Sequence, residues 1–487
     1  MGGVSIETSH FIPYPRTIVW DWHSMPGAVV RLTPRNVPMQ PVQQADNLAS
    51  GLTRFSLPAG LVWDAQHELA GYRKGHQFVD VCTSAPIKLF SQWRHVHTFK
   101  DEGPSGTMIT DSVSTRVPAR ALKSLFAFRQ HALLGDLNAL ARINATAPES
   151  MYADPSTDSE ALPSVLSLGL PDNRRLRPLT VAVTGSRGLV GRALTAQLTT
   201  AGHKVIQLVR GDAKPGQRHW TPQRPDPDLL DDVDVLVHLA GEPLLGRFND
   251  EHKKAIYDSR VYPTSKLAEV VASSPRCATM LCASSIGFYG ADRGEEKLSE
   301  DSSAGEGFLA TMVQDWEDAC EPAREAGKRV VNIRTGVVLA ANGGVLAILK
   351  MLFSAGLGGP FGERNPWFSW ISLDDLTDIY LRAAIDPALE GPVNATAPNP
   401  VPNTKMVSAL GAELNRPAII PIPSIGPKLL LGTEGAEELA LANQRVLPSR
   451  HLELGHEFRH IAIETCLAHE LGGQELLNND QGSNDAD

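Results

Sequence analysis

The chain has 487 residues, 42% of them hydrophobic, and a formal net charge of −10. Its length suggests about three domains, and its acidity disfavours nucleic acid or an anionic membrane as a partner. No apolar run of about eighteen residues could cross a membrane. Five scattered cysteines without a CxxC pair favour a reducing compartment. We therefore expect a soluble, cytoplasmic protein.

Residues 1–145 are expected to form a separate α+β domain. Apolar residues recur at helical spacing between Leu122 and Leu140, after a strand-like region. The predicted strands include residues 51–57, 62–69, 77–82, 91–99 and 108–117. This order of elements, with VWDWH at 19–23, resembles the START or polyketide-cyclase-like fold, a helix-grip domain. The resemblance implies an apolar cavity between sheet and helix that could hold a hydrophobic ligand.

Two histidines of this domain are spaced as metal ligands can be. His95 and His97 are two residues apart on one predicted strand and therefore share a face. The sequence indicates no third ligand. We therefore expect the polar face of an exposed strand, and no metal site.

A strand, a glycine turn and a helix follow a predicted linker. Residues 146–178 are rich in Pro, Ser, Asp and Glu, which favours a linker. The stretch 179–191, LTVAVTGSRGLVG, reads as a buried strand ending in Gly185, Gly188 and Gly191, and a helical pattern continues from it. Such a turn lets the backbone approach a pyrophosphate, which free N–H groups at the helix start can bind. We predict an α/β fold with a Rossmann-type doubly wound parallel sheet.

Arg210 indicates which dinucleotide binds. It ends the second predicted strand, where an acid would bind the ribose 2′-hydroxyl of NAD and an arginine accommodates a 2′-phosphate. Arg187 lies within the glycine turn, so NADP(H) is the predicted cofactor; the alternative is two solvated surface arginines. We expect cofactor contacts from Gly185, Ser186, Arg187, Gly188, Leu189, Val190, Gly191, Val209, Arg210, Leu239, Ala240, Gly241, Arg260 and Val337.

Further motifs occur in a characteristic order. They are TGSRGLVG (184–191), HLAGE (238–242), DSRV (258–261), SSIGFYG (284–290), RTGVVL (334–339) and WISLDDL (370–376). This order resembles an extended short-chain dehydrogenase/reductase, and more narrowly the nucleoside-diphosphate-sugar epimerase family with a small C-terminal domain. The resemblance implies a Rossmann domain over 179–399 and a small domain over 400–471. The polar residues 472–487 predict a disordered tail.

The expected catalytic centre departs from that superfamily. Its enzymes use a serine and then a Tyr-x-x-x-Lys pair, in which lysine lowers the tyrosine pKa for proton transfer. Ser284 occupies the serine position, but Phe308 and Met312 stand where tyrosine and lysine belong. We predict Ser284 as the substrate-orienting residue and Tyr289 as the proton donor, with Asp315 or Glu317 facing the site. Tyr289 is equally explained as a packed turn residue.

Two other motifs are interpreted as coincidental. The Tyr-x-x-x-Lys at 262–266 precedes the serine strand, and Pro263 should disfavour a continuous helix. The HExxH at 456–460 matches the zinc-peptidase pattern, which requires a helix. We expect Phe458 to pack inward and a helix to begin only near Ile461.

Three functions remain open at this point. The leading hypothesis is an NADP(H)-dependent oxidoreductase or epimerase acting on a nucleotide-sugar-like or other small carbonyl or alcohol substrate. The rival is a non-catalytic protein that senses NADP(H) or binds a hydrophobic ligand. A zinc peptidase is a remote third, and homodimerisation is left open.

Overall fold

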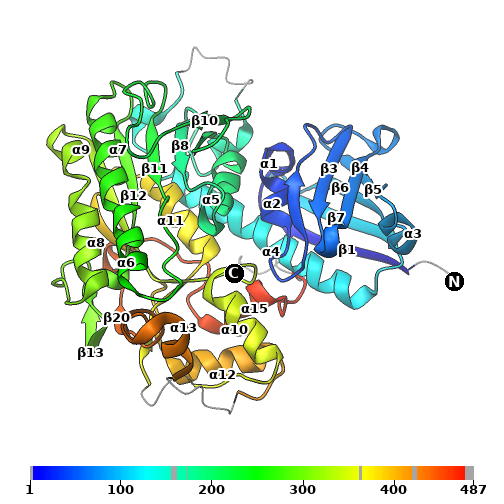
Figure 1. Ribbon diagram of the computed structural model, residues 1–487. Coiled ribbons are helices and arrows are strands. Elements are labelled where there is room, and N and C mark those ends of the chain that lie inside the picture. Colours follow the sequence, from blue (N-terminus) through cyan, green and yellow to red (C-terminus); the bar gives the residue numbers. More distant parts are fainter. Residues whose placement is uncertain (1–3, 155–161, 173, 361–364, 419–424, 478–487) are drawn as a thin grey trace, which may run out of the picture.

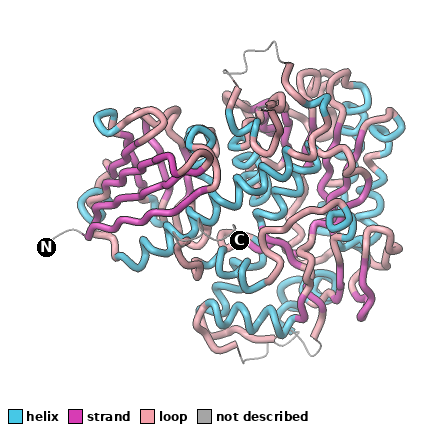
Figure 2. Tube along the Cα trace, turned by 180° about the vertical axis from the view of Figure 1, so that it is seen from behind, coloured by secondary structure: helices cyan, strands magenta, loops and turns pink. Residues whose placement is uncertain are grey.

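The computed structural model describes residues 4–154, 162–172, 174–360, 365–418 and 425–477. Within them, two seven-stranded sheets form the centres of two modules that pack side by side (Figure 1). Figure 2 shows the antiparallel sheet of the N-terminal module at one side of the molecule and the larger α/β module at the other. None of the described helices is both long and apolar enough to span a membrane.

The N-terminal module is an antiparallel sheet covered on one face by a long helix. Its strand order is β1-β7-β6-β5-β4-β3-β2. The strands are β1 (Val4–Ile12), β2 (Gln40–Gln43), β3 (Gly51–Ser56), β4 (Val62–His67), β5 (Gln77–Cys82), β6 (Arg94–Glu102) and β7 (Gly106–Thr115). The helices are α1 (Arg16–Ser24), α2 (Ala28–Leu32), α3 (Ile87–Ser91) and α4 (Ala119–Asn144). The helical spacing from Leu122 to Leu140 correctly predicted α4, which buries both residues.

The inner face of this sheet differs from the sequence prediction. His95 and His97 on β6 are only 3% and 4% exposed, so the expected exposed polar strand face is wrong. The expected apolar interior is also incomplete, because the buried carboxylate of Asp111 lies beside both imidazoles. The register explains this, since β5 and β7 flank β6 and supply carboxylates that the spacing within β6 cannot reveal.

The predicted linker is largely packed rather than free. Val165, Leu166 and Leu176 are fully buried, and Asn144 at the end of α4 donates from Nδ2 to the Val165 and Leu168 carbonyls. Residues 155–161 and 173 of this segment lie outside the described residues. The described residues of the predicted linker therefore pack their apolar side chains into the core between the two modules.

The second sheet confirms the Rossmann-type α/β fold. Its seven strands are parallel in the order β10-β9-β8-β11-β12-β14-β18. They are β8 (Thr180–Thr184), β9 (Lys204–Val209), β10 (Gln217–His219), β11 (Val235–His238), β12 (Thr279–Ser285), β14 (Arg329–Thr335) and β18 (Gly391–Ala395).

Helices cover both faces of the parallel sheet. Val181 and Val183 of β8 share a core with α5 (Leu189–Thr200) and α11 (Leu373–Ile385), whereas Ala182 faces the other side. That other side is covered by α6 (Asp250–Asp258), α7 (Val261–Ser273), α8 (Phe308–Asp318) and α9 (Glu321–Glu325). Buried strand composition with helices on both faces is what a parallel sheet requires.

Short strands and helices complete the C-terminal part. The strands are β13 (Asp292–Leu298), β15 (Val337–Leu339), β16 (Trp367–Phe368), β17 (Trp370–Ser372), β19 (Val401–Pro402) and β20 (Asn443–Val446). The helices are α10 (Gly344–Ser354), α12 (Asn403–Glu413), α13 (Ile425–Gly435), α14 (Ser449–Glu453) and α15 (Ile463–Leu471). Residues 472–477 of the predicted disordered tail are ordered along α4, where Leu477 N donates to Gln130 Oε1. Residues 478–487 lie outside the described residues.

The modules share one apolar core. Leu137 of α4, Leu198 of α5 and Ile379 of α11 belong to the same buried cluster. Gly27, with φ of 96°, lies so close to α5 that a Cβ would come within 2.6 Å of the Ala196 carbonyl oxygen. The two modules are therefore held together by a closely packed apolar interface as well as by the connecting chain.

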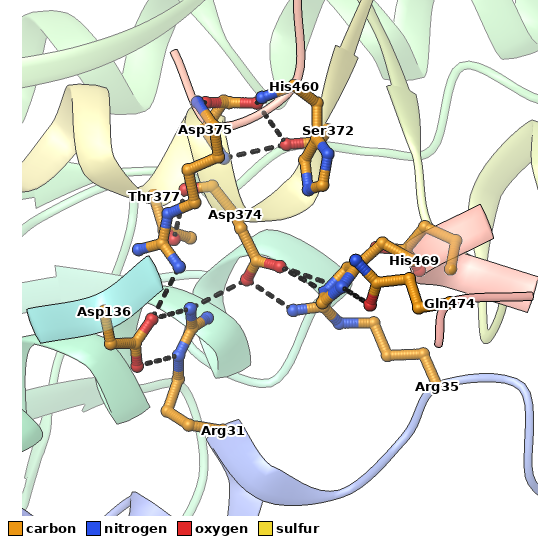
Figure 3. A network of polar contacts seen from close by, with 12 residues as sticks. Arg31, Arg35, Asp136, Ser372, Asp374, Asp375, Thr377, His460, His469 and Gln474 are labelled. Carbon is orange, nitrogen blue, oxygen red and sulfur yellow. Dashed lines mark hydrogen bonds and ion pairs between the residues drawn. The ribbon is translucent and has the colours of Figure 1, made fainter. Parts of the chain in front are cut away.

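A buried ion network crosses the same interface (Figure 3). Asp374, in the first turn of α11, binds Arg31 at 2.7 Å and Arg35 at 2.5 Å, both from the N-terminal module. Its other oxygen lies 3.1 Å from His469 Nε2 on α15. Burial by itself would raise the Asp374 pKa, but Arg35 and Arg31 hold that pKa well below its usual value. One carboxylate thus joins three parts of the chain.

Replacing Asp374 with Asn should destabilise the protein, because Arg31 and Arg35 would stay buried with too little negative charge. We expect the free energy of unfolding to fall by about 3–5 kcal/mol, as for other broken buried ion pairs. Urea unfolding followed by circular dichroism measures this. Lys266→Met, which removes the more exposed Lys266–Glu269 pair, should cost no more than about 1 kcal/mol; equal losses in both variants would contradict the network's role.

Candidate functional site

The glycine turn lies at the carboxyl edge of the parallel sheet. Gly185 has φ of 66°, and a Cβ at Gly191 would come within 2.3 Å of the Gly185 carbonyl oxygen. Only glycine fits where α5 starts so close behind the turn. Helix α5 begins at Leu189 directly after Gly188, so its first N–H groups are available for a phosphate.

A buried threonine fixes the neighbouring strand ends. Thr184 Oγ1 accepts from the backbone N–H groups of Leu239 and Ala240, at 3.1 and 3.2 Å. It also lies 2.7 Å from His238 Nδ1. The ends of β8 and β11 are therefore held at the edge where Rossmann-type sheets bind dinucleotides.

Three predicted cofactor-binding arginines surround this edge in different environments. Arg187 and Arg210 are exposed, and neither forms an ion pair with another described residue. Val209 is buried at the end of β9, and Arg210 follows it directly. Arg260 is 8% exposed, and its Nε has no hydrogen-bond partner among the described residues.

The environment of Arg260 is unusual for a cation. Its guanidinium lies over the Trp316 ring, 5.2 Å from the centroid, and a Cβ at Gly241 would approach it to 2.9 Å. Burial lowers the Arg260 pKa to about 10. Arg260 Nη1 donates to the Ile256 carbonyl at 3.2 Å, but Arg260 forms no ion pair with another described residue. A buried cation of this kind beside the Gly241 backbone is a candidate anion-binding group.

A cleft of about 620 Å³ opens beside the glycine turn, between the two modules. The α/β module lines it with Arg187, Arg192 and Lys350, and the N-terminal module with Asn36 and Met39. Its volume lies within the range of small-molecule sites. The N-terminal module thus forms one wall of a cationic cleft next to the predicted cofactor site.

Ser284 and Tyr289 belong to one buried hydrogen-bond network. Ser284 Oγ donates to Glu317 Oε1 at 2.5 Å, and Glu317 forms a bidentate pair with Arg334 at 2.9 and 2.8 Å. Arg334 Nη1 donates to the Tyr289 hydroxyl at 3.2 Å, and that hydroxyl lies 2.8 Å from Asn394 Oδ1. Tyr289 is fully buried, and burial raises its pKa.

This network was only partly visible in the sequence. Glu317 faces Ser284 as proposed, whereas Asp315 instead accepts from the Tyr257 hydroxyl at 2.9 Å. Arg334 and Asn394 were not predicted as site residues. Arg334 lies in β14 and Asn394 lies in β18, so a polar residue within an otherwise apolar buried strand was the available signal.

The alternative Tyr-x-x-x-Lys lies on the protein surface. Tyr262 is 50% exposed, and Lys266 Nζ donates to Glu269 at 2.7 Å. The expectation that Pro263 breaks the helix is wrong, because it lies in the first turn of α7, where its missing N–H costs nothing. On α8, Met312 stands where the lysine of the superfamily belongs, and its side chain is 1% exposed within the core. Met312 therefore does not replace the lysine.

The HExxH segment does not form a zinc-peptidase site. Residues 456–460 are not helical, and α15 starts only at Ile463. The ring of His456 lies 5.3 Å from that of His451, whereas the ring of His460 lies 5.1 Å from that of His469. The two histidines therefore face different neighbours, and the helix that would align them is missing.

The parallel sheet, the glycine turn and the cations around it define an NAD(P)-binding Rossmann protein. Residues 181–394 match the NAD dependent epimerase/dehydratase family, and residues 422–470 match a domain of unknown function, DUF1731. An epimerase family protein of Mycobacterium bovis, Mb2239, is 41% identical over 293 residues, which are 59% of this chain and 96% of that protein. The chain therefore belongs to the NAD dependent epimerase/dehydratase family.

Two solved structures extend this comparison. A Corynebacterium glutamicum structure described as a nucleoside-diphosphate sugar epimerase is 52% identical, with a TM-score of 0.82, and the match covers 97% of this chain and 91% of that one. Human SDR39U1 (isoform 2), solved with NADPH, is 30% identical with a TM-score of 0.56, covering 60% of this chain and 99% of that one. The first match therefore includes the N-terminal module.

The buried histidines of the α/β module should make stability depend on pH. Burial lowers the pKa of His238 to about 4 and that of His456 to about 3. In the unfolded chain these pKa values return to about 6.5. Because the unfolded chain then binds more protons, this stability is complete above about pH 6.5 and is lost as the pH falls toward these folded values.

Replacing His456 with Gln should make this loss shallower by up to about 1.4 kcal/mol per pH unit, the effect of one proton. Urea unfolding between about pH 4.5 and 7.5 measures the slope. His219→Gln, at an exposed position, is the control and should leave the slope unchanged. Identical slopes in the two variants would show that burial of His456 does not cause the pH dependence.

Proposed function

We propose that the protein is an NADP(H)-dependent oxidoreductase or epimerase. The observation that carries the proposal is the pair of exposed arginines, Arg187 and Arg210, one in the glycine turn and one at the end of β9. Cations in these positions match a ribose 2′-phosphate, where NAD-binding proteins use an acid. The human relative solved with NADPH supports this choice of dinucleotide.

The cofactor contacts divide into three groups. The turn residues Gly185, Ser186, Gly188, Val190 and Gly191 and the N-terminus of α5 at Leu189 would hold the pyrophosphate. Val209, Leu239, Ala240 and Gly241 would form the pocket of the adenosine half, with Arg260 behind it. Val337, after β14, would contact the nicotinamide half.

The substrate in this proposal is a nucleotide-sugar-like or other small carbonyl or alcohol compound. Family membership supports this class. Ser284 stands at the carboxyl end of β12 and would orient the substrate, while its hydroxyl already donates to Glu317. For Tyr289 to donate a proton, its hydroxyl would have to leave Asn394, because it is enclosed in the described network.

That enclosure favours a second candidate, a protein that binds NADP(H) without turning over a substrate. Phe308 and Met312 replace the usual tyrosine and lysine, and neither can move a proton. In this alternative the Ser284–Glu317–Arg334 contacts stabilise the sheet edge, and the bound dinucleotide is a signal.

The N-terminal module would serve either function as a ligand-binding domain. Its antiparallel sheet and the long helix α4 support the comparison with a helix-grip domain. In this proposal the domain covers residues 1–145, and it is followed by a Rossmann domain over 179–399 and a small C-terminal domain over 400–471. A cytoplasmic location remains part of the proposal.

Replacing Arg210 with Glu should weaken NADPH binding about 10- to 100-fold, since a charge-assisted contact to phosphate is lost. NADH binding should change far less, because NADH lacks that phosphate. Isothermal titration calorimetry with both dinucleotides measures the ratio. Arg224→Glu, also at an exposed position, makes the same charge change elsewhere. An unchanged preference in Arg210→Glu would refute the NADP(H) assignment.

Transfer of the nicotinamide hydrogen separates the two candidate functions. With deuterium at nicotinamide C4, an enzyme should exchange the label stereospecifically with a nucleotide-sugar or carbonyl pool. Ser284→Ala should slow this exchange at least about 100-fold, whereas Tyr262→Phe on the surface should not. Absence of exchange in a protein that binds NADPH normally would favour the non-catalytic alternative.

A further inference from the structure

Four side chains from three adjacent strands meet inside the N-terminal module. Asp80 of β5 lies opposite His95 of β6, and His97 of β6 lies opposite Asp111 of β7. Both histidines are at least 96% buried, as is Asp111. They point to the same face because they are two residues apart on a strand. This cluster is separate from the glycine turn and the cleft.

The two carboxylates approach different nitrogens of the imidazoles. Asp111 Oδ1 lies 2.8 Å from His95 Nε2 and 3.0 Å from His97 Nδ1. Asp80 Oδ2 lies on the other nitrogens, 3.6 Å from His95 Nδ1 and 3.2 Å from His97 Nε2. The hydrogen bonds join His95 to Asp111 and His97 to Asp80. If His97 donates from Nδ1 to Asp111 instead, the lone pairs of both imidazoles face Asp80.

We propose that Asp80, His95 and His97 bind a divalent transition-metal ion, with Zn²⁺ as the best match. Ligand atoms from these three residues all lie within 4.8 Å of one another. Ligands about 2.0–2.1 Å from a tetrahedral Zn²⁺ are about 3.3 Å apart, close to the separations of Asp80 from both imidazoles. Two imidazoles and a carboxylate are an established ligand set for this class of ion.

Asp111 is the positioning residue of this site. Metal-binding histidines almost always donate their second N–H to a carboxylate or carbonyl, which fixes the tautomer and the ring orientation. Here one carboxylate serves both rings, whose centroids are 3.7 Å apart. The contacts to Asp111 therefore prepare both imidazoles to ligate on the opposite side.

A divalent cation would also improve the charge balance of the cluster. Among the described residues, the only ion-pair partners of Asp80 and Asp111 are these two histidines. One proton on an imidazole would compensate one of the two negative charges, whereas a divalent ion compensates both. Uncompensated buried charge is costly, and a metal ion entering this site would release any such proton to water.

In a second cluster of possible metal ligands, the negative charges are already compensated by an arginine. Asp374, His469 and Glu470 also bring ligand atoms together. There, however, the guanidinium group of Arg35 binds both carboxylates. Among the described residues, no arginine or lysine forms an ion pair with Asp80 or Asp111. We therefore assign the metal ion to the cluster of Asp80, His95 and His97 and not to that of Asp374. With three protein ligands, the fourth position of a tetrahedral ion would be left to water or another small ligand.

The full-length chain, expressed without a histidine tag and stripped with a chelator, tests this proposal. Added Zn²⁺ should bind in about a 1:1 ratio and raise the melting temperature. His97→Gln should abolish this binding, and Asp111→Asn should weaken it about 10- to 100-fold. His76→Gln, an exposed histidine of the same module, should bind as the unmodified chain does.

Co²⁺ added to the unmodified chain provides a readout that needs no variant. Intense visible absorption bands of four-coordinate Co²⁺, displaced by Zn²⁺, would support the site even if His97→Gln failed to fold. Absence of these bands, or equal Zn²⁺ affinity in folded His97→Gln and His76→Gln proteins, would overturn the proposal.

Discussion

The buried carboxylate of Asp374 is the constraint on which the arrangement of the modules depends. It starts α11, a helix whose other end packs on the Rossmann sheet, and it binds arginines that belong to the N-terminal module. A carboxylate that is 1% exposed cannot remain charged without such partners. The arginines of the N-terminal module therefore compensate a buried charge of the α/β module. This explains why apolar packing and ion pairs occur at the same interface.

The same constraint shapes the candidate site. Arg31 lies in α2 and Arg35 lies just after it, and the segment that follows forms a wall of the cleft beside the glycine turn. Fixing α2 against α5 therefore fixes the shape of that cleft. The N-terminal module thus lines the cleft beside the glycine turn, even though the described residues that match the family lie outside this module.

The sequence predicted features that depend on local pattern. The long helix that contains Leu122 and Leu140 and the position of the glycine turn follow from composition and spacing. The sequence could not predict contacts created by register, because Asp80 and Asp111 reach His95 from neighbouring strands. It also misjudged Pro263, since the effect of proline depends on whether it falls in the first turn of a helix or later. Long-range pairing, not local propensity, placed the buried carboxylates, and position within the helix decided the effect of the proline.

The network at the end of β12 encloses the side chains that the proposed proton transfer would need. In a reductase the groups beside the nicotinamide must exchange a proton with the substrate, which needs an accessible acid with a tuned pKa. Here Glu317 is paired with Arg334, an arginine that cannot give up its proton, and Tyr289 is fully buried behind it. Chemistry at Ser284 would therefore have to use an acid brought by the substrate, by water or by the C-terminal part, while the dinucleotide edge formed by Thr184 and the glycine turn stays intact. Dinucleotide binding at the glycine turn and proton transfer at Ser284 would therefore depend on different residues of this fold.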